Sequence, residues 1–171
     1  MAHNQESVII KLIDAERIES SSPEEKTAIS SIIDEYGLKS AQAQSIKLPM
    51  TTYSKFLESD HRMYIAYNQD EIPLGFLRVG MKHLYYYDRK GKCMELDPLC
   101  VLDFYVSEDH QRKGIGLSLV NFMLQEEQIE LRKTAWDKPT KQSFALLAKH
   151  FDLTDFVPNP NNYVIFDQFF S

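Results

Sequence analysis

Residues 99–116 read LCVLDFYVSEDHQRKGIG and carry the strongest secondary-structure pattern in the chain. Its first part, Leu99–Val106, is almost continuously apolar, as expected of a central β-strand that is covered on both faces. A polar segment follows, and Gly114 and Gly116 then precede an apolar pattern at helical spacing. The stretch therefore predicts a buried strand, a glycine turn and a helix in immediate succession.

The segments on either side predict further strands and helices. Ser22-Pro23-Glu24-Glu25 is typical of a capped helix start. Gly37 is expected to end or bend that helix, but the good helix formers at 41–44 let helical structure resume as far as Ser45. Hydrophobic runs predict strands at 7–13, 63–67, 74–79, 84–87, 93–96, 134–136 and 163–166, and helical spacing predicts helices around 119–124 and over 140–150. We therefore expect an α+β fold in one domain, residues 1–171, with a mixed central β-sheet flanked by helices and an inserted β-hairpin at 84–96.

The composition fits one globular domain of 171 residues, 43% of them hydrophobic and 26% charged. Nineteen basic and 25 acidic side chains give a net charge of −6, which excludes a protein whose main partner is the nucleic-acid backbone. The sequence has no signal-peptide pattern, no apolar run long enough for a membrane span, and two cysteines without close-spaced ligand partners. We expect a cytosolic, reduced protein that binds no structural metal, nucleic acid or membrane.

The segment Gln111-Arg112-Lys113-Gly114-Ile115-Gly116 has the composition of a phosphate-binding turn. Glycines let the backbone approach a ligand closely, and the N–H groups of the first helical turn point outward. The helix dipole and the charges of Arg112 and Lys113 favour an anion there. A P-loop lysine–serine or lysine–threonine pair is missing, and Leu119 occupies the place of the third glycine of a dinucleotide-binding fingerprint. The alternative is a plain turn and helix start that binds nothing.

The pattern Q-x-x-G-x-G after an apolar strand resembles the pyrophosphate loop of GCN5-related N-acetyltransferases, which bind acetyl-CoA. Other segments resemble the α-tubulin N-acetyltransferase family, namely residues 32–35, 43–44, 98–106, 123–125, 135–140, 149–151, 157–158 and 161–166. The similarity runs from Thr27 to Phe170. It departs from the family at Lys138 and Thr140, where arginine and serine are usual, at Gln142, where lysine is common, and in the hairpin.

The resemblance implies a lysine N-acetyltransferase that moves acetyl from acetyl-CoA to the ε-amine of a lumenal lysine of α-tubulin in microtubules. It implies catalytic roles for Gln44, Cys100 and Asp137. Cofactor contacts are expected from Phe104, Tyr105, Val106, Gln111, Arg112, Lys113, Gly114, Ile115, Gly116, Leu117, Thr140, Lys141, Gln142, Ser143, Phe144 and Lys149. Substrate contacts are expected from Arg78, Lys82, Tyr85, Glu95, Asp97 and Lys138. The protein is expected to be a cytoplasmic monomer that associates with microtubules, those of cilia included.

The chemistry of acetyl transfer gives each predicted catalytic residue a role and an alternative. A lysine ammonium must lose a proton, at a cost of roughly 4 to 5 kcal/mol at pH 7, so Asp137 is predicted to act as base, directly or through a water. Its alternative is a cap on the next turn. Cys100 is predicted to lie near a direct transfer without carrying the acetyl group, and its alternative is a small core residue. Gln44 is predicted to position the substrate or a water, and its alternative is a surface helix position.

Two other functions fit the same residues. The first is a GCN5-related enzyme that acts on a small amine or on a lysine of another protein, since it would share the glycine loop. The second is a microtubule-associated or CoA-binding module without catalysis. Tubulin is itself acidic, so the net charge of −6 gives the leading interpretation no global electrostatic attraction.

Overall fold

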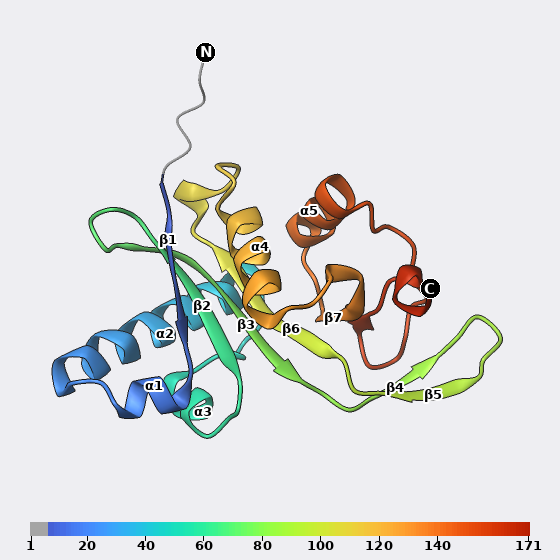
Figure 1. Ribbon diagram of the computed structural model, residues 1–171, viewed down its shortest axis with the longest axis horizontal. Coiled ribbons are helices and arrows are strands. Elements are labelled where there is room, and N and C mark those ends of the chain that lie inside the picture. Colours follow the sequence, from blue (N-terminus) through green and yellow to red (C-terminus); the bar gives the residue numbers. More distant parts are fainter. Residues whose placement is uncertain (1–6) are drawn as a thin grey trace, which may run out of the picture. The chain divides into compact units, whose positions relative to one another are not determined.

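The computed structural model describes residues 7–171 (Figure 1). These residues form two compact units. The first unit contains the chain up to Arg78 together with Asp103–Met123. The second unit contains Val79–Leu102 together with Leu124–Ser171.

Within the described residues the strands form a six-stranded sheet, in the order β1-β2-β3-β6-β7-β8, and a separate two-stranded sheet of β4 and β5. The strands are β1 (Ile9–Ile13), β2 (Arg62–Tyr67), β3 (Pro73–Met81), β4 (Leu84–Tyr87), β5 (Cys93–Leu96), β6 (Leu99–Val106), β7 (Thr134–Asp137) and β8 (Tyr163–Val164). β1 pairs antiparallel with β2, β6 parallel with β7, and β7 antiparallel with β8. The predicted mixed sheet, α+β class and inserted hairpin are confirmed.

Helix α2 (Pro23–Ala43) begins where the sequence predicts and passes through Gly37. Ser22 caps it, since its side chain accepts a hydrogen bond from the N–H of Glu25 at 3.2 Å. The helix does not end at Gly37 but continues to Ala43, close to the predicted limit at Ser45. A Cβ at residue 37 would lie 2.0 Å from the carbonyl oxygen of Thr51, so this glycine lets another backbone segment pass directly against the helix.

The other helices include the two that the sequence predicts after the glycine turn and after β7. The helices are α1 (Ala15–Glu19), α3 (Tyr53–Leu57), α4 (Ile115–Glu127) and α5 (Lys141–Phe151). The short helices α1 and α3 were not predicted, because five residues are too few to show a period. Among the described residues no helix combines the length and the apolar character needed to cross a lipid bilayer.

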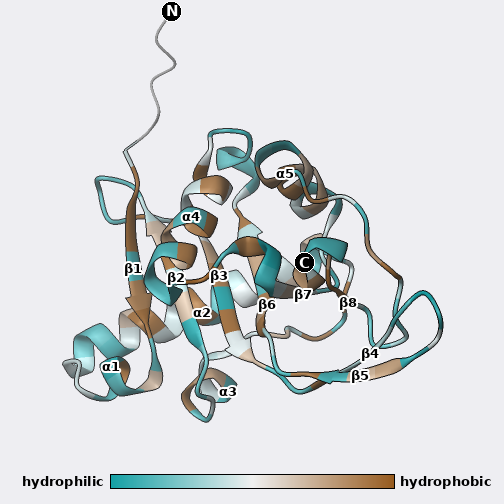
Figure 2. Ribbon diagram, turned by 45° about the vertical axis from the view of Figure 1, so that its right-hand side comes forward, coloured by the Kyte–Doolittle hydropathy of each residue, from teal (hydrophilic) through white to brown (hydrophobic). Residues whose placement is uncertain are grey.

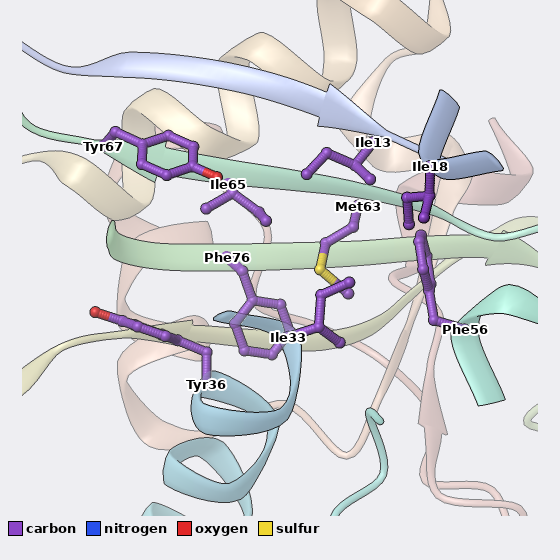
Figure 3. Packing of buried hydrophobic residues seen from close by; sticks show 9 residues of the cluster. All are labelled: Ile13, Ile18, Ile33, Tyr36, Phe56, Met63, Ile65, Tyr67 and Phe76. Carbon is purple, nitrogen blue, oxygen red and sulfur yellow. The ribbon is translucent and has the colours of Figure 1, made fainter. Parts of the chain in front are cut away.

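The core of the first unit joins α2 to the strands β1, β2 and β3. Figure 3 shows side chains from these elements and from α1 and α3 pointing toward one another. The buried members are Ile13, Ile18, Ile33, Tyr36, Phe56, Met63, Ile65, Tyr67 and Phe76. In Figure 2, β1 is mostly hydrophobic and α1 is mostly hydrophilic, and each contributes one buried residue to this core, Ile13 and Ile18. Burial of these side chains fixes the position of α2, and hence of Gln44 at its end.

The β4–β5 hairpin of the second unit has one buried face and one exposed face. Leu84 and Tyr86 are buried in a cluster with Cys100, whereas Tyr85 and Tyr87 are exposed. On its other edge β4 meets two asparagine side chains instead of a strand. Asn159 accepts a hydrogen bond from the N–H of Tyr87 at 2.8 Å and donates to its carbonyl at 3.3 Å, while Asn161 donates to the carbonyl of Tyr85 at 3.2 Å. Both backbone groups of Tyr87 and the carbonyl of Tyr85 on this edge are therefore paired.

Candidate active site

The predicted glycine loop leads from β6 into α4 in the first unit. The side chain of Gln111 donates to the carbonyl of Val106 at 2.9 Å, which ties the loop to the end of the strand. Arg112 and Gly114 have φ angles of +66° and +80°, so the backbone turns sharply before α4 begins at Ile115. A Cβ at Gly114 would meet no atom within 4 Å, so the backbone here is open to a ligand. The loop has the turn and the following helix start that an anion-binding site needs.

Strand β6 changes its surroundings along its length. Its residues up to Asp103 are buried, whereas Phe104, Tyr105 and Val106 are half-buried. Burial raises the pKa of Tyr105, whose ring packs edge-on against Tyr36 at 6.1 Å. The predicted cofactor contacts of this strand therefore lie where it becomes accessible.

Helix α5 begins with a capped turn in the second unit. Thr140 accepts from the N–H of Ser143 at 3.2 Å, and Ser143 is buried. Phe144 stacks on Phe156 at 5.6 Å, while Lys141 and Lys149 are exposed. Of the predicted cofactor residues of α5, Ser143 and Phe144 already pack within the fold, whereas Lys141, Gln142 and Lys149 are exposed.

Cys100 and Asp137 lie in the second unit, on the neighbouring parallel strands β6 and β7. Cys100 pairs with Ala135 in the strand register, and Asp137 is the last residue of β7. Burial raises the pKa of the Cys100 thiol to about 12, with an opposing effect from Lys82 and a further rise from the charge of Asp137. The thiol is therefore neutral at pH 7 and makes a poor nucleophile.

The backbone turns sharply after Asp137. Lys138 has a φ of +42°, and its N–H donates to the carbonyl of Asn162 at 3.1 Å. This turn leaves Asp137 half-buried at the strand end.

A buried carboxylate that the sequence analysis did not select lies in the first unit. Asp103 is 4% exposed and accepts hydrogen bonds from Ser40 and Thr51, both at 2.6 Å, and from the N–H of Phe104 at 3.0 Å. Gln44 donates to Ser40 at 3.0 Å, and Arg78 donates to Thr51 at 3.0 Å. We call Ser40, Gln44, Thr51, Arg78 and Asp103 the Asp103 cluster. An aspartate within the apolar run LCVLDFYV is the signal that could have revealed it.

The guanidinium of Arg78 is occupied within its unit. Besides Thr51 it contacts Nδ1 of His61 at 2.8 Å and the carbonyl of Met50 at 3.4 Å. The prediction that Arg78 binds substrate stays a prediction beside this structural role.

The hairpin region carries an exposed polar group at the ends of β4 and β5. His83 lies 2.7 Å from Asp97 and 3.2 Å from Glu95, and its ring meets that of Tyr85 edge-on at 5.4 Å. We call His83, Glu95 and Asp97 the His83 cluster. The cluster joins His83 to two of the predicted substrate residues, Glu95 and Asp97, and a third, Tyr85, lies beside it.

The comparisons with known proteins decide the family. The family model described as "GNAT acetyltransferase, Mec-17" matches residues 2–171. The chain belongs to this family. A Mec-17 relative from Phytophthora infestans, named α-tubulin N-acetyltransferase, is 38% identical over 86% of this chain and 92% of its own length. An α-tubulin N-acetyltransferase 1 from Danio rerio is 37% identical over 96% of this chain, and one from Tetrahymena thermophila is 39% identical over 98%.

The chain spans only part of some of these relatives, 57% of the length of the Danio rerio protein and 41% of the Tetrahymena thermophila protein. Among solved structures, the acetyltransferase domain of xEco2 bound to a CoA conjugate has a TM-score of 0.59 at 12% identity, covering 87% of this chain and 93% of that one. A mutant of the AtaT toxin has a TM-score of 0.53 at 10% identity, covering 98% and 93%. At such identities these likenesses show the fold alone, and they confirm the predicted GCN5-related N-acetyltransferase fold.

This Mec-17 chain distributes the predicted site residues over both units. The first unit contains Gln44, Arg78, the accessible end of β6 and the glycine loop, and the second contains Cys100, Asp137, Lys138, α5 and the hairpin. Within the part of the chain that the structure describes, no group of three or more histidine, cysteine, aspartate or glutamate side chains is arranged to hold a metal ion.

Proposed function

We propose that this chain is an acetyl-CoA-dependent protein lysine N-acetyltransferase that acetylates the ε-amine of a lumenal lysine of α-tubulin in microtubules. The family match over residues 2–171 carries the proposal. The names of the relatives, α-tubulin N-acetyltransferase, support α-tubulin as the proposed substrate. The glycine turn between β6 and α4 supplies a place for the diphosphate of the cosubstrate.

The cosubstrate would be held by the residues that the sequence predicts. The loop Gln111–Leu117 offers backbone N–H groups and the charges of Arg112 and Lys113, and Phe104–Val106 offer the accessible edge of β6. Thr140, Lys141, Gln142, Ser143, Phe144 and Lys149 form the remaining predicted contacts on and before α5. Acetyl-CoA supplies the thioester whose acetyl group is transferred.

Asp137 is the proposed base. The substrate ammonium gives up a proton, to Asp137 or through a water, and the neutral amine attacks the thioester carbonyl. The new C–N bond forms and the C–S bond breaks, so CoA leaves as a thiolate with the electron pair of that bond. The nitrogen gives up its second proton, and the thiolate takes up a proton, directly or through a water. A backbone N–H of residues 102–106 is the proposed donor to the oxyanion that develops on the carbonyl.

Cys100 has no covalent role in this reaction. A thiol with a pKa of about 12 is almost wholly protonated at pH 7, so it does not take up the acetyl group. Amine and thioester therefore react directly in one ternary complex, and their proximity supplies much of the rate.

The protein substrate is proposed to contact Arg78, Lys82, Tyr85, Glu95, Asp97 and Lys138. Residues 1–171 would act as one catalytic domain and as a monomer, without metal, in the cytoplasm on microtubules and cilia. The runner-up function is acetyl transfer to a small amine or to a lysine of another protein.

An acetylation assay tests the proposal. Labelled acetyl-CoA is incubated with assembled microtubules, free tubulin or a polyamine, using the wild-type chain and Asp137→Asn. We expect label on α-tubulin and a loss of about 100-fold or more in Asp137→Asn, since the variant lacks the base. Asp70→Asn, in the exposed turn between β2 and β3, is the matched control and should keep full activity.

The other outcomes separate the alternatives. Label on the polyamine alone would overturn the tubulin assignment and support the runner-up. Acetyl-CoA binding by calorimetry without transfer to any acceptor would support a binding module. Asp137→Asn should still bind acetyl-CoA, so a lost affinity would contradict its role as base.

The direct-transfer step has its own test in the reactivity of the two cysteines. Cys93 is exposed and Cys100 is buried. At neutral pH a thiol reagent should label the native chain at Cys93 and leave Cys100 unmodified, as read by mass spectrometry. Rapid labelling of Cys100, or acetylated Cys100 after incubation with acetyl-CoA alone, would contradict direct transfer.

A further inference from the structure

A chain of hydrogen bonds leads from a buried carboxylate to the side chain of Gln44. Ser40 Oγ lies 2.6 Å from Asp103 Oδ1, and Gln44 Nε2 lies 3.0 Å from Ser40 Oγ. Ser40 and Asp103 are 1% and 4% exposed, while Gln44 is half-buried at the C-terminal end of α2. The chain of bonds therefore starts in the interior and ends at a side chain that solvent reaches.

The carboxylate fixes the direction of every bond in this chain. An ionised carboxylate only accepts hydrogen bonds, so the Ser40 hydroxyl donates its single proton to Asp103. The Ser40 oxygen is then an acceptor, and only the amide –NH₂ of Gln44 has a proton to give it. Because the amide is planar, the carbonyl oxygen Oε1 of Gln44 points away from Ser40.

The opposite orientation of the amide would bring two oxygens together without a proton between them. It would lose the bond to Ser40 and leave a buried hydroxyl oxygen without its donor. Among the described residues no donor is bonded to Gln44 Oε1, so this oxygen keeps its full capacity to accept. A molecule from outside the chain can use it.

We infer that Asp103, acting through Ser40, is a positioning residue that presents the Gln44 carbonyl oxygen as a hydrogen-bond acceptor for an N–H group of the protein substrate. This rests on the proposed function for the identity of the substrate, and it specifies the class of group that meets Gln44. A backbone amide N–H or an ammonium belongs to that class. A carboxamide has no basic group, so Gln44 holds the substrate and does not remove its proton.

Hydrogen exchange of the glutamine side chains tests the orientation without any measurement of activity. In a chain labelled with ¹⁵N at glutamine side chains, the –NH₂ signals of Gln44 should exchange with water more slowly than those of Gln42, which is exposed two residues earlier. Gln44→Ala assigns the signals by their loss. Ser40→Ala should bring the exchange of Gln44 to the rate of Gln42. Equal rates in the wild-type chain, or no effect of Ser40→Ala, would overturn the inference.

Steady-state kinetics on microtubules tests whether the substrate donates a hydrogen bond to the Gln44 carbonyl oxygen. Gln44→Met and Ser40→Ala should each raise the KM for microtubules about threefold to tenfold, the value of one hydrogen bond, and leave the KM for acetyl-CoA unchanged. The double variant should be no worse than Gln44→Met alone, and Gln42→Met should behave as wild type. Gln44→Met alters only the half-buried residue of this hydrogen-bond network and leaves the buried ones unchanged. It therefore stays informative if Ser40→Ala folds poorly. An unchanged KM for microtubules in Gln44→Met would overturn the inference.

Substitutions at position 44 that supply only an acceptor or only a donor test which of the two the substrate needs. In the Ser40→Ala background, Gln44→Glu retains an acceptor and Gln44→Lys supplies only a donor. We expect the lower KM for microtubules with glutamate, although tubulin is acidic and overall charge favours lysine. A lower KM with lysine would overturn the assignment. If the wild-type chain transfers no acetyl to tubulin, the proposed function and the substrate donor both fail, while the exchange rates still decide the orientation of Gln44.

Discussion

The Asp103 cluster and the His83 cluster place similar chemical groups in opposite surroundings. Asp103 is 4% exposed and accepts three hydrogen bonds, each from a donor that is held by a helix, a loop or the strand itself. In the His83 cluster, by contrast, the carboxylates of Glu95 and Asp97 are 62% and 72% exposed and share one histidine. When a buried acceptor is removed, its donors are left without a hydrogen bond because no water reaches them. When an exposed acceptor is removed, water accepts the bond instead. We therefore expect the first cluster to determine geometry and stability, and the second to respond mainly to pH and salt.

The largest expected effect comes from removing the buried carboxylate. Asp103→Ala leaves the hydroxyls of Ser40 and Thr51 without their acceptor in a dry site, so we expect a loss of about 3 kcal/mol in the free energy of unfolding. Urea denaturation at neutral pH measures it. Asp97→Ala is the matched control and should leave the midpoint unchanged. Equal shifts in the two variants would remove the distinction between the clusters.

A smaller effect is expected at the glycine that lets Thr51 approach α2. Gly37→Ala would put a Cβ 2.0 Å from the carbonyl oxygen of Thr51, and the backbone that carries one donor to Asp103 would have to shift. We expect a loss of about 2 kcal/mol by thermal or urea denaturation. An exposed glycine within a helix would gain up to about 1 kcal/mol from the same change, so a stabilised variant would show that the close approach is unimportant.

The smallest effect on stability is expected from the surface cluster, where pH is the variable. Hydrogen bonds to Asp97 and then to Glu95 raise the pKa of His83 in the folded chain. A raised folded pKa means that the contribution to stability is complete below the ordinary histidine pKa, about 6.5, and is lost as pH rises through the folded value. The histidine is exposed, so this contribution is small and falls with added salt.

NMR titration of the His83 ring measures that shift directly. Asp97→Asn should bring the pKa back toward its ordinary value, and Glu95→Gln should do so to a lesser degree. A titration curve that neither substitution moves would show that the carboxylates do not act on His83.

Local patterns predicted the elements that depend on local causes. The apolar run Leu99–Val106 gave β6 with its bounds, and the Ser22 cap gave the start of α2. The same reasoning left the effect of Gly37 open, because its cause is the close approach of the Thr51 carbonyl, and the neighbouring sequence does not show that contact.

The candidate site was predictable only where a motif is continuous in the sequence. The glycine loop was identified from adjacent residues, and the structure gives it the expected turn before α4. The Asp103 cluster was not, since its carboxylate meets Ser40 and Thr51 across 63 and 52 residues of sequence. The orientation of the Gln44 amide depends on the direction of these hydrogen bonds. It therefore cannot be predicted until the fold brings Ser40 and Asp103 together.

The asparagine side chains that pair with β4 bear on how the protein behaves when it is concentrated. An unpaired strand edge is a template for the edge of another molecule, and a short two-stranded ribbon has little else to prevent such joining. Asn159 and Asn161 occupy three backbone groups that a foreign strand would need, and they do so with side chains that cannot extend the ladder further. Purified protein carrying alanine at both positions is therefore the preparation in which we would look first for turbidity and for fibrous aggregates on storage.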